Sequence, residues 1–206
     1  MTSSHTPAAS AANQPVFNER GLMDPAIPPE AEIQRGMMRA EGQSFADWME
    51  SRVARRDTRR YDWDALKFQA DFDPRYRRAQ MRYVGTGGTG VAKDANTVPS
   101  GHFTFSTMVI PAGNIGPSHI HYDVEEIFFV MRGAMKVICE KDGERWEAVV
   151  GERDLISVPP GVYREEHNIG DEDALMCVML GSPKPITPVY PPDSPLAAFK
   201  RNLTKA

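Results

Sequence analysis

The chain lacks long hydrophobic runs, has little cysteine and carries no overall excess of positive charge. No apolar stretch approaches the roughly 20 residues that a membrane-spanning helix needs. The N-terminal sequence MTSSHTPAASAANQP has neither a basic start nor an apolar segment, so it does not resemble a secretory signal peptide. We therefore expect a cytoplasmic protein without a membrane partner.

Only two cysteines, Cys139 and Cys177, occur among the 206 residues. Both lie in apolar, strand-like runs, MKVICE and ALMCVML, which is typical of buried, reduced thiols. A catalytic cysteine would need a nearby base and some exposure, and the sequence supports neither.

The net charge is -4, but it is unevenly distributed, because residues 52–82 hold ten Lys or Arg against five Asp. Aromatic residues within this basic stretch, such as Tyr61 and Trp63, would suit contact with nucleic acid. The interleaved acids and the negative total favour a solvated face instead, or docking onto the acidic barrel of a partner subunit. We expect no nucleic-acid partner.

The composition divides the chain into four parts. Residues 1–30 are rich in Ser, Ala, Pro and Asn and predict a flexible N-terminal segment. Residues 31–80 predict a helical N-terminal extension, in which Ser44 and Asp47 resemble a capped helix start. Residues 81–181 alternate short β-rich runs with Gly and Pro turns, which is typical of an antiparallel barrel or sandwich. Residues 182–206 form a Pro-rich C-terminal tail, expected to be irregular.

Residues 85–90, GTGGTG, match the glycine pattern of dinucleotide-binding loops. That motif requires a helix immediately after the glycines, and the following VAKDANTVPSG has no helical apolar period. No acidic residue lies near position 110, where a ribose-binding carboxylate would be needed. We interpret the segment as a glycine turn or loop at the mouth of the barrel.

Residues 113–133, GNIGPSHIHYDVEEIFFVMRG, contain the candidate metal ligands. His119 and His121 are two apart on a predicted strand, so their side chains project from the same face. After a turn, Glu126 begins the next strand and can face the pair; its neighbour Glu125 is a rival, but strand parity sends the two to opposite faces. Two imidazoles and a carboxylate suit Fe(II), Mn, Co, Ni or Zn.

The spacing of Gly113, His119, His121, Glu126 and Gly133 resembles the first motif of the cupin superfamily. Residues 151–173, GERDLISVPPGVYREEHNIGDED, resemble its second motif. This resemblance covers about residues 80–181 and implies an all-β fold: a single cupin jelly-roll barrel with a helical N-terminal extension. It also implies a site inside the barrel, open at one end, and a homodimer.

The second motif departs from the family at one position, because Arg164 stands where the usual fourth ligand is a histidine. Strand parity places Arg164, Glu166 and Asn168 on one face and His167 on the other, from which His167 reaches a metal only through a bulge. The fourth protein ligand is therefore His167, Glu166 or absent. Arg164 either clamps an anionic substrate or pairs with Glu166. His102, at a strand start, is either structural or part of the pocket.

These residues predict a metal-dependent enzyme, with non-haem iron dioxygenase as the leading hypothesis and a small anionic or ketone-bearing molecule as substrate. His119, His121, Glu126 and, as the fourth candidate, His167 would bind the metal. Arg164 would bind substrate, and Glu166 or His167 would move protons. The alternatives are a non-redox isomerase, lyase or cyclase using Zn, Ni or Mn, and a metal-free cupin that binds a small molecule.

Overall fold

A computed structural model describes residues 37–203, except residues 90, 92–93, 95 and 184. The segment 1–30 and the start of the predicted helical extension therefore lie outside the described residues. The helical elements of the described part are α2 (Phe45–Glu50), α3 (Lys67–Phe72), α4 (Pro195–Leu203) and the 3-10 turns Arg56–Thr58 and Pro74–Tyr76. None of these helices has the length and apolar character needed to cross a membrane.

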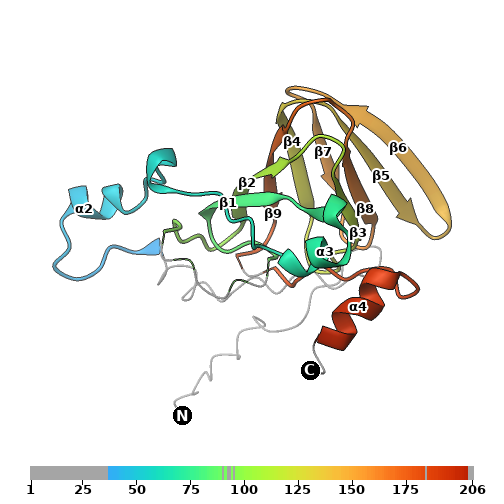
Figure 1. Ribbon diagram of the computed structural model, residues 1–206. Helices are drawn as coiled ribbons and strands as arrows, with labels where there is room; N and C mark the ends of the chain where they lie inside the picture. Colours follow the sequence, from blue (N-terminus) through green and yellow to red (C-terminus); the bar gives the residue numbers. More distant parts are fainter. Residues whose placement is uncertain (1–36, 90, 92–93, 95, 184, 204–206) are drawn as a thin grey trace, which may run out of the picture.

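The described strands are β1 (Ala79–Val84), β2 (Thr104–Ile110), β3 (Ile115–His119), β4 (Glu126–Arg132), β5 (Met135–Lys141), β6 (Glu144–Val150), β7 (Leu155–Val158), β8 (Tyr163–Asn168) and β9 (Ala174–Leu180). They form two antiparallel sheets, ordered β1-β2-β9-β4-β7 and β3-β8-β5-β6, which enclose the barrel (Figure 1). The predicted all-β, single-barrel fold is confirmed.

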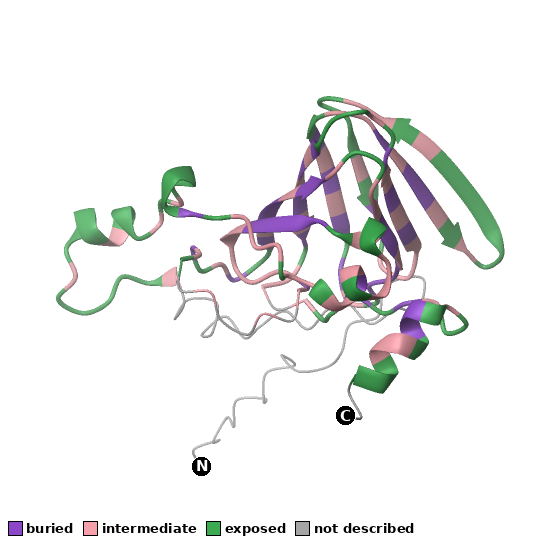
Figure 2. Ribbon diagram, in the orientation of Figure 1, coloured by how far each residue is buried: buried purple, intermediate pink, exposed green. Residues whose placement is uncertain are grey.

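The apolar core fills the space between the two sheets. In β9 every second side chain is buried, from Ala174 to Leu180, so this strand turns one apolar face inward. Phe128 and Val130 of β4 are also buried, and they belong to the same apolar cluster as Met135 of β5 in the other sheet. Buried and less buried positions alternate along several strands in Figure 2. Each such buried side chain stabilises the fold by about 1.5–3 kcal/mol relative to leaving it exposed.

Strand β8 uses the same alternation but buries polar groups: Arg164, Glu166 and Asn168. This confirms the parity predicted from the sequence. The Asn168 side chain is structural, because its Nδ2 donates to the carbonyl oxygens of Ile110 (2.9 Å) and Glu172 (2.7 Å). Arg164 and Glu166 have no comparable anchoring, so they point to a function inside the barrel.

The described part of the N-terminal extension, from residue 37 to residue 80, contains short helices and 3-10 turns joined by loops. Ser44 caps α2 as predicted, its Oγ accepting a hydrogen bond from the Asp47 amide (3.0 Å). The helix spans only six residues and none of them is buried; Phe45 is 63% exposed. Figure 1 shows α2 far from the barrel. Short helices depend on packing for stability, and α2 buries none of its residues.

The Pro-rich tail ends in a helix that was not predicted. Ser194 Oγ accepts a hydrogen bond from the Ala197 amide (3.1 Å), and Pro195 opens α4. Leu196 and Ala197 are buried in a small cluster with Tyr190, against which Phe68 and Phe72 of α3 pack. The tail is therefore irregular only up to this helix, and α3 and α4 lie together beside one end of the barrel (Figure 1).

Both cysteines are free thiols. Cys139 and Cys177 are partly buried, as reduced thiols within strands β5 and β9. Burial nevertheless raises the pKa of both thiols, which keeps them protonated and unreactive near neutral pH.

Candidate metal centre

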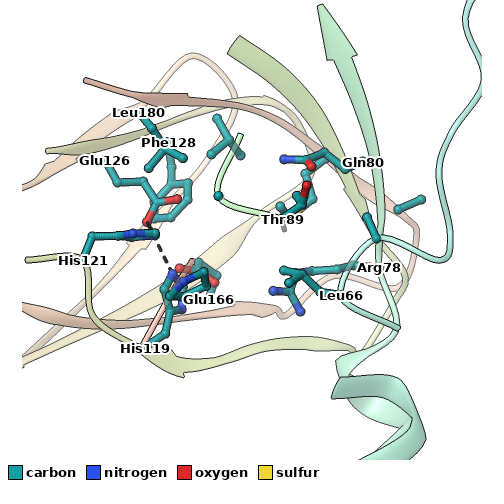
Figure 3. A pocket seen from close by; sticks show the side chains of 16 residues that line it. Leu66, Arg78, Gln80, Thr89, His119, His121, Glu126, Phe128, Glu166 and Leu180 are labelled. Carbon is teal, nitrogen blue, oxygen red and sulfur yellow. Dashed lines mark ion pairs between the residues drawn. The ribbon is translucent and has the colours of Figure 1, made fainter. Parts of the chain in front are cut away.

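The structure brings His119, His121 and Glu126 together inside the barrel (Figure 3). His119 ends β3, His121 follows the bridge residue Ile120, and Glu126 opens β4. One potential ligand atom from each of the three lies within 4.8 Å of the others. Glu126 Oε2 is 3.4 Å from His119 Nε2 and 3.8 Å from His121 Nε2. All three residues are buried.

Both imidazoles are prepared to act as ligands. His119 Nδ1 lies 2.8 Å from the carbonyl oxygen of Pro117. Because a carbonyl can only accept, Nδ1 carries a proton, and in the neutral ring Nε2 is then free to bind a metal at the centre of the cluster. Burial lowers the pKa of His121 to about 4, so this imidazole is also neutral at physiological pH.

Glu126 supplies the negative charge. Its burial opposes ionisation, but His119, His121 and Arg164 outweigh that effect and lower the pKa of the carboxyl to about 2. Glu126 Oε2 is buried and has no hydrogen-bond partner among the described residues. This oxygen faces two imidazoles and lies 3.3 Å from Arg164 Nε, and two imidazoles with one carboxylate form a ligand set that suits a divalent transition metal. Glu125, the rival ligand, is exposed and accepts a hydrogen bond from Ser157.

Arg164 takes neither of the two roles expected for it. The side chain is completely buried, and its Nε lies 3.3 Å from Glu126 Oε2, so its ion pair is with Glu126 rather than Glu166. None of its guanidinium nitrogens has a hydrogen-bond partner among the described residues. Arg164 is not part of the cavity wall, which argues against a substrate clamp at this position.

His167 lies on the other face of β8 and does not join the cluster. Its Nε2 is hydrogen-bonded to Glu165. The pairing of β8 with β5 runs without a shift from Tyr163 to Asn168, so there is no bulge to turn His167 inward. His167 therefore lies outside the three-residue cluster, and this geometry does not support it as a fourth ligand.

Glu166 does face the cavity. Burial raises its pKa to about 7, and the nearby Glu126 adds to the rise, whereas His119, Arg78 and Arg164 oppose it. The Glu166 carboxylate fits here because its partner on the neighbouring strand, Gly116, has no side chain; a Cβ at that position would collide with the carboxylate. Glu166 is thus a buried carboxyl beside the three candidate ligands and not one of them.

The cluster opens into a cavity of about 40 Å³, measured as the space open to the centre of a water molecule; the empty space is about 560 Å³ when the open mouth is counted. Its apolar wall is formed by Ala65, Leu66, Ala79, Met108, Phe128, Val178, Leu180 and Pro188. Gly88 and Thr89 of the GTGGTG segment also line it, as expected for a loop at the barrel mouth. A Cβ on Gly88 would lie 3.2 Å from His121 Cε1, so glycine permits this close approach. His102 is exposed and lies outside the wall.

Two polar residues of the wall, Arg78 and Gln80, were not identified from the sequence. Arg78 lies in the basic stretch that the charge pattern assigned to a solvated face, yet it is 8% exposed. Strand parity could have identified them. Arg78 immediately precedes β1 and Gln80 is the second residue of that strand, so the two are two positions apart and lie on one face.

The cupin domain family model matches residues 106–180. No curated protein matches the chain. Among solved structures, oxalate oxidase in complex with glycolate is 25% identical (TM-score 0.41), over 43% of this chain and 45% of that one. Oxalate decarboxylase of Lactobacillus farciminis is 15% identical (TM-score 0.47; 65% and 34% covered). KdgF from Halomonas sp. is 16% identical (TM-score 0.44; 64% and 93% covered).

The match with this oxalate oxidase spans less than half of that protein's length. The family match covers β2 to β9 and includes all three residues of the cluster. The order of the strands and the two sequence motifs agree with it. Residues 106–180 of the barrel match the cupin domain family, as the resemblance of the two sequence motifs predicted.

Proposed function

We propose that the protein is a metal-dependent cupin enzyme, and specifically a non-haem iron dioxygenase acting on a small organic substrate. The observation that supports this is the three-residue face of His119, His121 and Glu126 opening into a cavity. In the part of the chain that the structure describes, no fourth metal-binding side chain joins them. Two histidines and one carboxylate with open positions are the ligand set of non-haem Fe(II) oxygenases.

Each residue of the site would have a different role. His119 and His121 would hold the ion through Nε2, and Glu126 through its charged carboxylate. The bound metal would supply charge stabilisation and redox chemistry with dioxygen. Arg164 lies next to Glu126, and its positive charge favours the ionised form of that carboxyl. Glu166 offers a carboxyl that can give or take a proton within the cavity. Phe128, Leu180 and the other apolar wall residues exclude water around the reacting groups.

Two alternatives use the same pocket. A non-redox isomerase, lyase or cyclase would employ the same ligands with Zn, Ni or Mn as a Lewis acid. A metal-free binding cupin is favoured by one observation: Arg164 lies 3.3 Å from Glu126 Oε2 and already balances the charge of that carboxylate.

Metal content tests the proposal. The full chain is purified after growth with iron, and Fe, Mn, Co, Ni and Zn are measured per chain, alongside His121→Ala and His167→Ala. We expect nearly stoichiometric iron in the wild type and a loss of at least about tenfold in His121→Ala. His167→Ala is the matched control and should retain the metal, because His167 points away from the cluster.

The results separate the three functions. Iron together with oxygen consumption on addition of a substrate supports the dioxygenase. Metal without oxygen consumption during turnover supports the non-redox enzyme. A wild-type protein that binds no transition metal, even when reconstituted, refutes both enzymes and leaves the binding protein.

A further inference from the structure

We infer that Arg78 is the residue that binds the anionic group of the substrate, and that the substrate is a small organic acid. Its carboxylate would lie at Arg78, and its metal-binding oxygens would lie across the cavity at His119, His121 and Glu126. This inference rests on the proposed function in placing the second end of the substrate at the metal centre.

The position of Arg78 is the first argument. Its side chain lines the cavity on the side opposite the candidate metal ligands (Figure 3). Only 8% of the residue is exposed. A buried guanidinium that faces a cavity and the metal ligands across it is placed to hold one end of a molecule that occupies the space between them.

The second argument is that Arg78 has no anionic partner in the described part of the chain. Its recorded hydrogen bond runs from Nη1 to the Tyr76 carbonyl oxygen (3.2 Å), and no carboxylate lies within 4.0 Å of its guanidinium. Arg82, by contrast, pairs with both Asp62 and Asp94 at 2.9 Å. A guanidinium has five N–H donors, and among the described residues only the bond from Nη1 to Tyr76 is found for Arg78, so donors remain for a ligand. A carboxylate ligand would satisfy two of them at once.

The charges of the barrel interior give the third argument. Two cations, Arg78 and Arg164, face two carboxyl groups, Glu126 and Glu166. Even with both carboxyls ionised, the four charges only cancel, so a divalent metal would leave two uncompensated positive charges in a buried site. Buried charge of one sign is strongly unfavourable, and an anionic substrate removes the excess.

The wall between the two polar ends defines the rest of the substrate. Met108, Phe128, Val178 and Leu180 present apolar side chains to the cavity. Gln80 lines the cavity on the side of Arg78, with its Nε2 donating to Ser106 Oγ (2.8 Å). The site thus fits a short molecule with an oxygen-bearing group at each end and a carbon chain or ring between them.

Short dicarboxylates test the inference because they carry an anionic group at both ends. Binding of glutarate and adipate to the metal-loaded full chain is measured by calorimetry. It is compared with binding of pentanoate and hexanoate, which have the same chain lengths and only one carboxylate. We expect the dicarboxylates to bind at least about tenfold more tightly, since only they reach both the metal and Arg78.

Variants then assign the effect to one residue. Arg78→Met should reduce dicarboxylate affinity to that of the monocarboxylate, and Arg78→Lys should recover part of it. Arg77→Met is the matched control: the neighbouring arginine is exposed and stacks on Trp63, 4.5 Å from the ring centroid. The Arg77→Met variant loses the same charge and should bind the dicarboxylates as tightly as the wild type does. Circular dichroism and metal content confirm that each variant is folded and loaded.

Each outcome decides the inference. Dicarboxylate binding that survives in Arg78→Met, or a wild type without preference for the second carboxylate, overturns it. If Arg78→Met does not fold, the preference of the wild type and the partial loss in Arg78→Lys still decide. If the wild type holds no metal but retains Arg78-dependent binding of the dicarboxylates, the proposed enzyme is wrong while the anion site stands.

Discussion

Replacing Gly116 with alanine tests whether Glu166 points into the barrel, on which the description of the site depends. Gly116 in β3 pairs with Glu166 in β8. A Cβ at Gly116 would collide with Glu166 Oε2 and lie 3.3 Å from its Cδ. Both residues are buried, so the Glu166 carboxylate can avoid the added methyl group only by moving further into the cavity that it lines. The backbone of Gly116 is not in the left-handed region, so alanine adds no backbone strain of its own.

Two effects set the size of the change. Forcing an extra methyl group into a packed interior costs about 1–3 kcal/mol. Replacing glycine by alanine within a strand returns about 0.5–1 kcal/mol. We therefore expect Gly116→Ala to lower the free energy of unfolding by about 1–2 kcal/mol. In a Glu166→Ala background the colliding atoms are gone and the nearest remaining atom, the Cβ, is 3.9 Å away. The same change should then be neutral or slightly stabilising.

The assay is a double-mutant cycle by urea denaturation of the metal-free proteins at one pH. We expect a coupling energy of about 1–3 kcal/mol between the two positions. Gly151→Ala is the control, because a Cβ there meets only Asp154 Oδ2, at 3.8 Å. An equal cost for Gly116→Ala in both backgrounds would refute the inward position of the Glu166 carboxylate.

Three further predictions concern pH, the C-terminal helix and assembly. With a pKa of about 4 in the fold, His121 contributes stability that is present above its ordinary pKa of 6.5 and is lost as pH falls toward 4. Glu166, with a pKa of about 7, contributes stability that is present below its ordinary 4.5 and is lost as pH rises through 7. The two slopes oppose each other between pH 5 and 7. With the Glu166 slope removed, the stability of metal-free Glu166→Gln should rise as the pH increases from 5 to 7, which the urea midpoints measure. A pH profile equal to that of the wild type contradicts this assignment. Leu196→Ala should lower the free energy of unfolding by about 2–4 kcal/mol, because Leu196 of α4 is buried in the cluster that joins this helix to α3. Leu203→Ala, at a half-exposed position, should change stability by less than about 0.5 kcal/mol, and equal effects would refute the docked helix. The homodimer expected from the family resemblance stays a prediction; light scattering should give twice the mass of one chain, and a monomer would contradict it.

The barrel and the candidate ligands were predictable because both depend on the two-residue period of a strand. That period placed His119 with His121, separated Glu126 from Glu125, and put Arg164 and Glu166 inside β8. Applied to the residues around β1, the same rule would have placed Arg78 with Gln80 on one face. The basic stretch concealed it, since most of the charges around Arg78 are solvated.

The remaining differences come from tertiary contacts, which no local pattern contains. The partner of Arg164 is Glu126, 38 positions away in the sequence and on the other sheet. Helix α4 forms at Ser194 and Pro195, a local start signal, but its stability comes from the aromatic residues of α3. The apolar residues around α2 have a helical period, but none of the residues of this helix is buried.

Arg164 also determines how strongly the site would hold a metal. In the family pattern this position usually supplies a histidine ligand; here it supplies a cation 3.3 Å from the oxygen of Glu126 that would bind the ion. The arginine repels a metal ion and competes for that oxygen, so the three-ligand site should bind a metal less tightly than the same site without this cation. Arg164→His removes the positive charge and adds an imidazole. We expect metal affinity to rise at least about tenfold in competition titrations with a chelator. Arg145→His, an exposed position on β6, is the matched control and should leave the affinity unchanged. An Arg164→His protein that binds metal no better than the wild type would show that Arg164 does not act on the metal through Glu126.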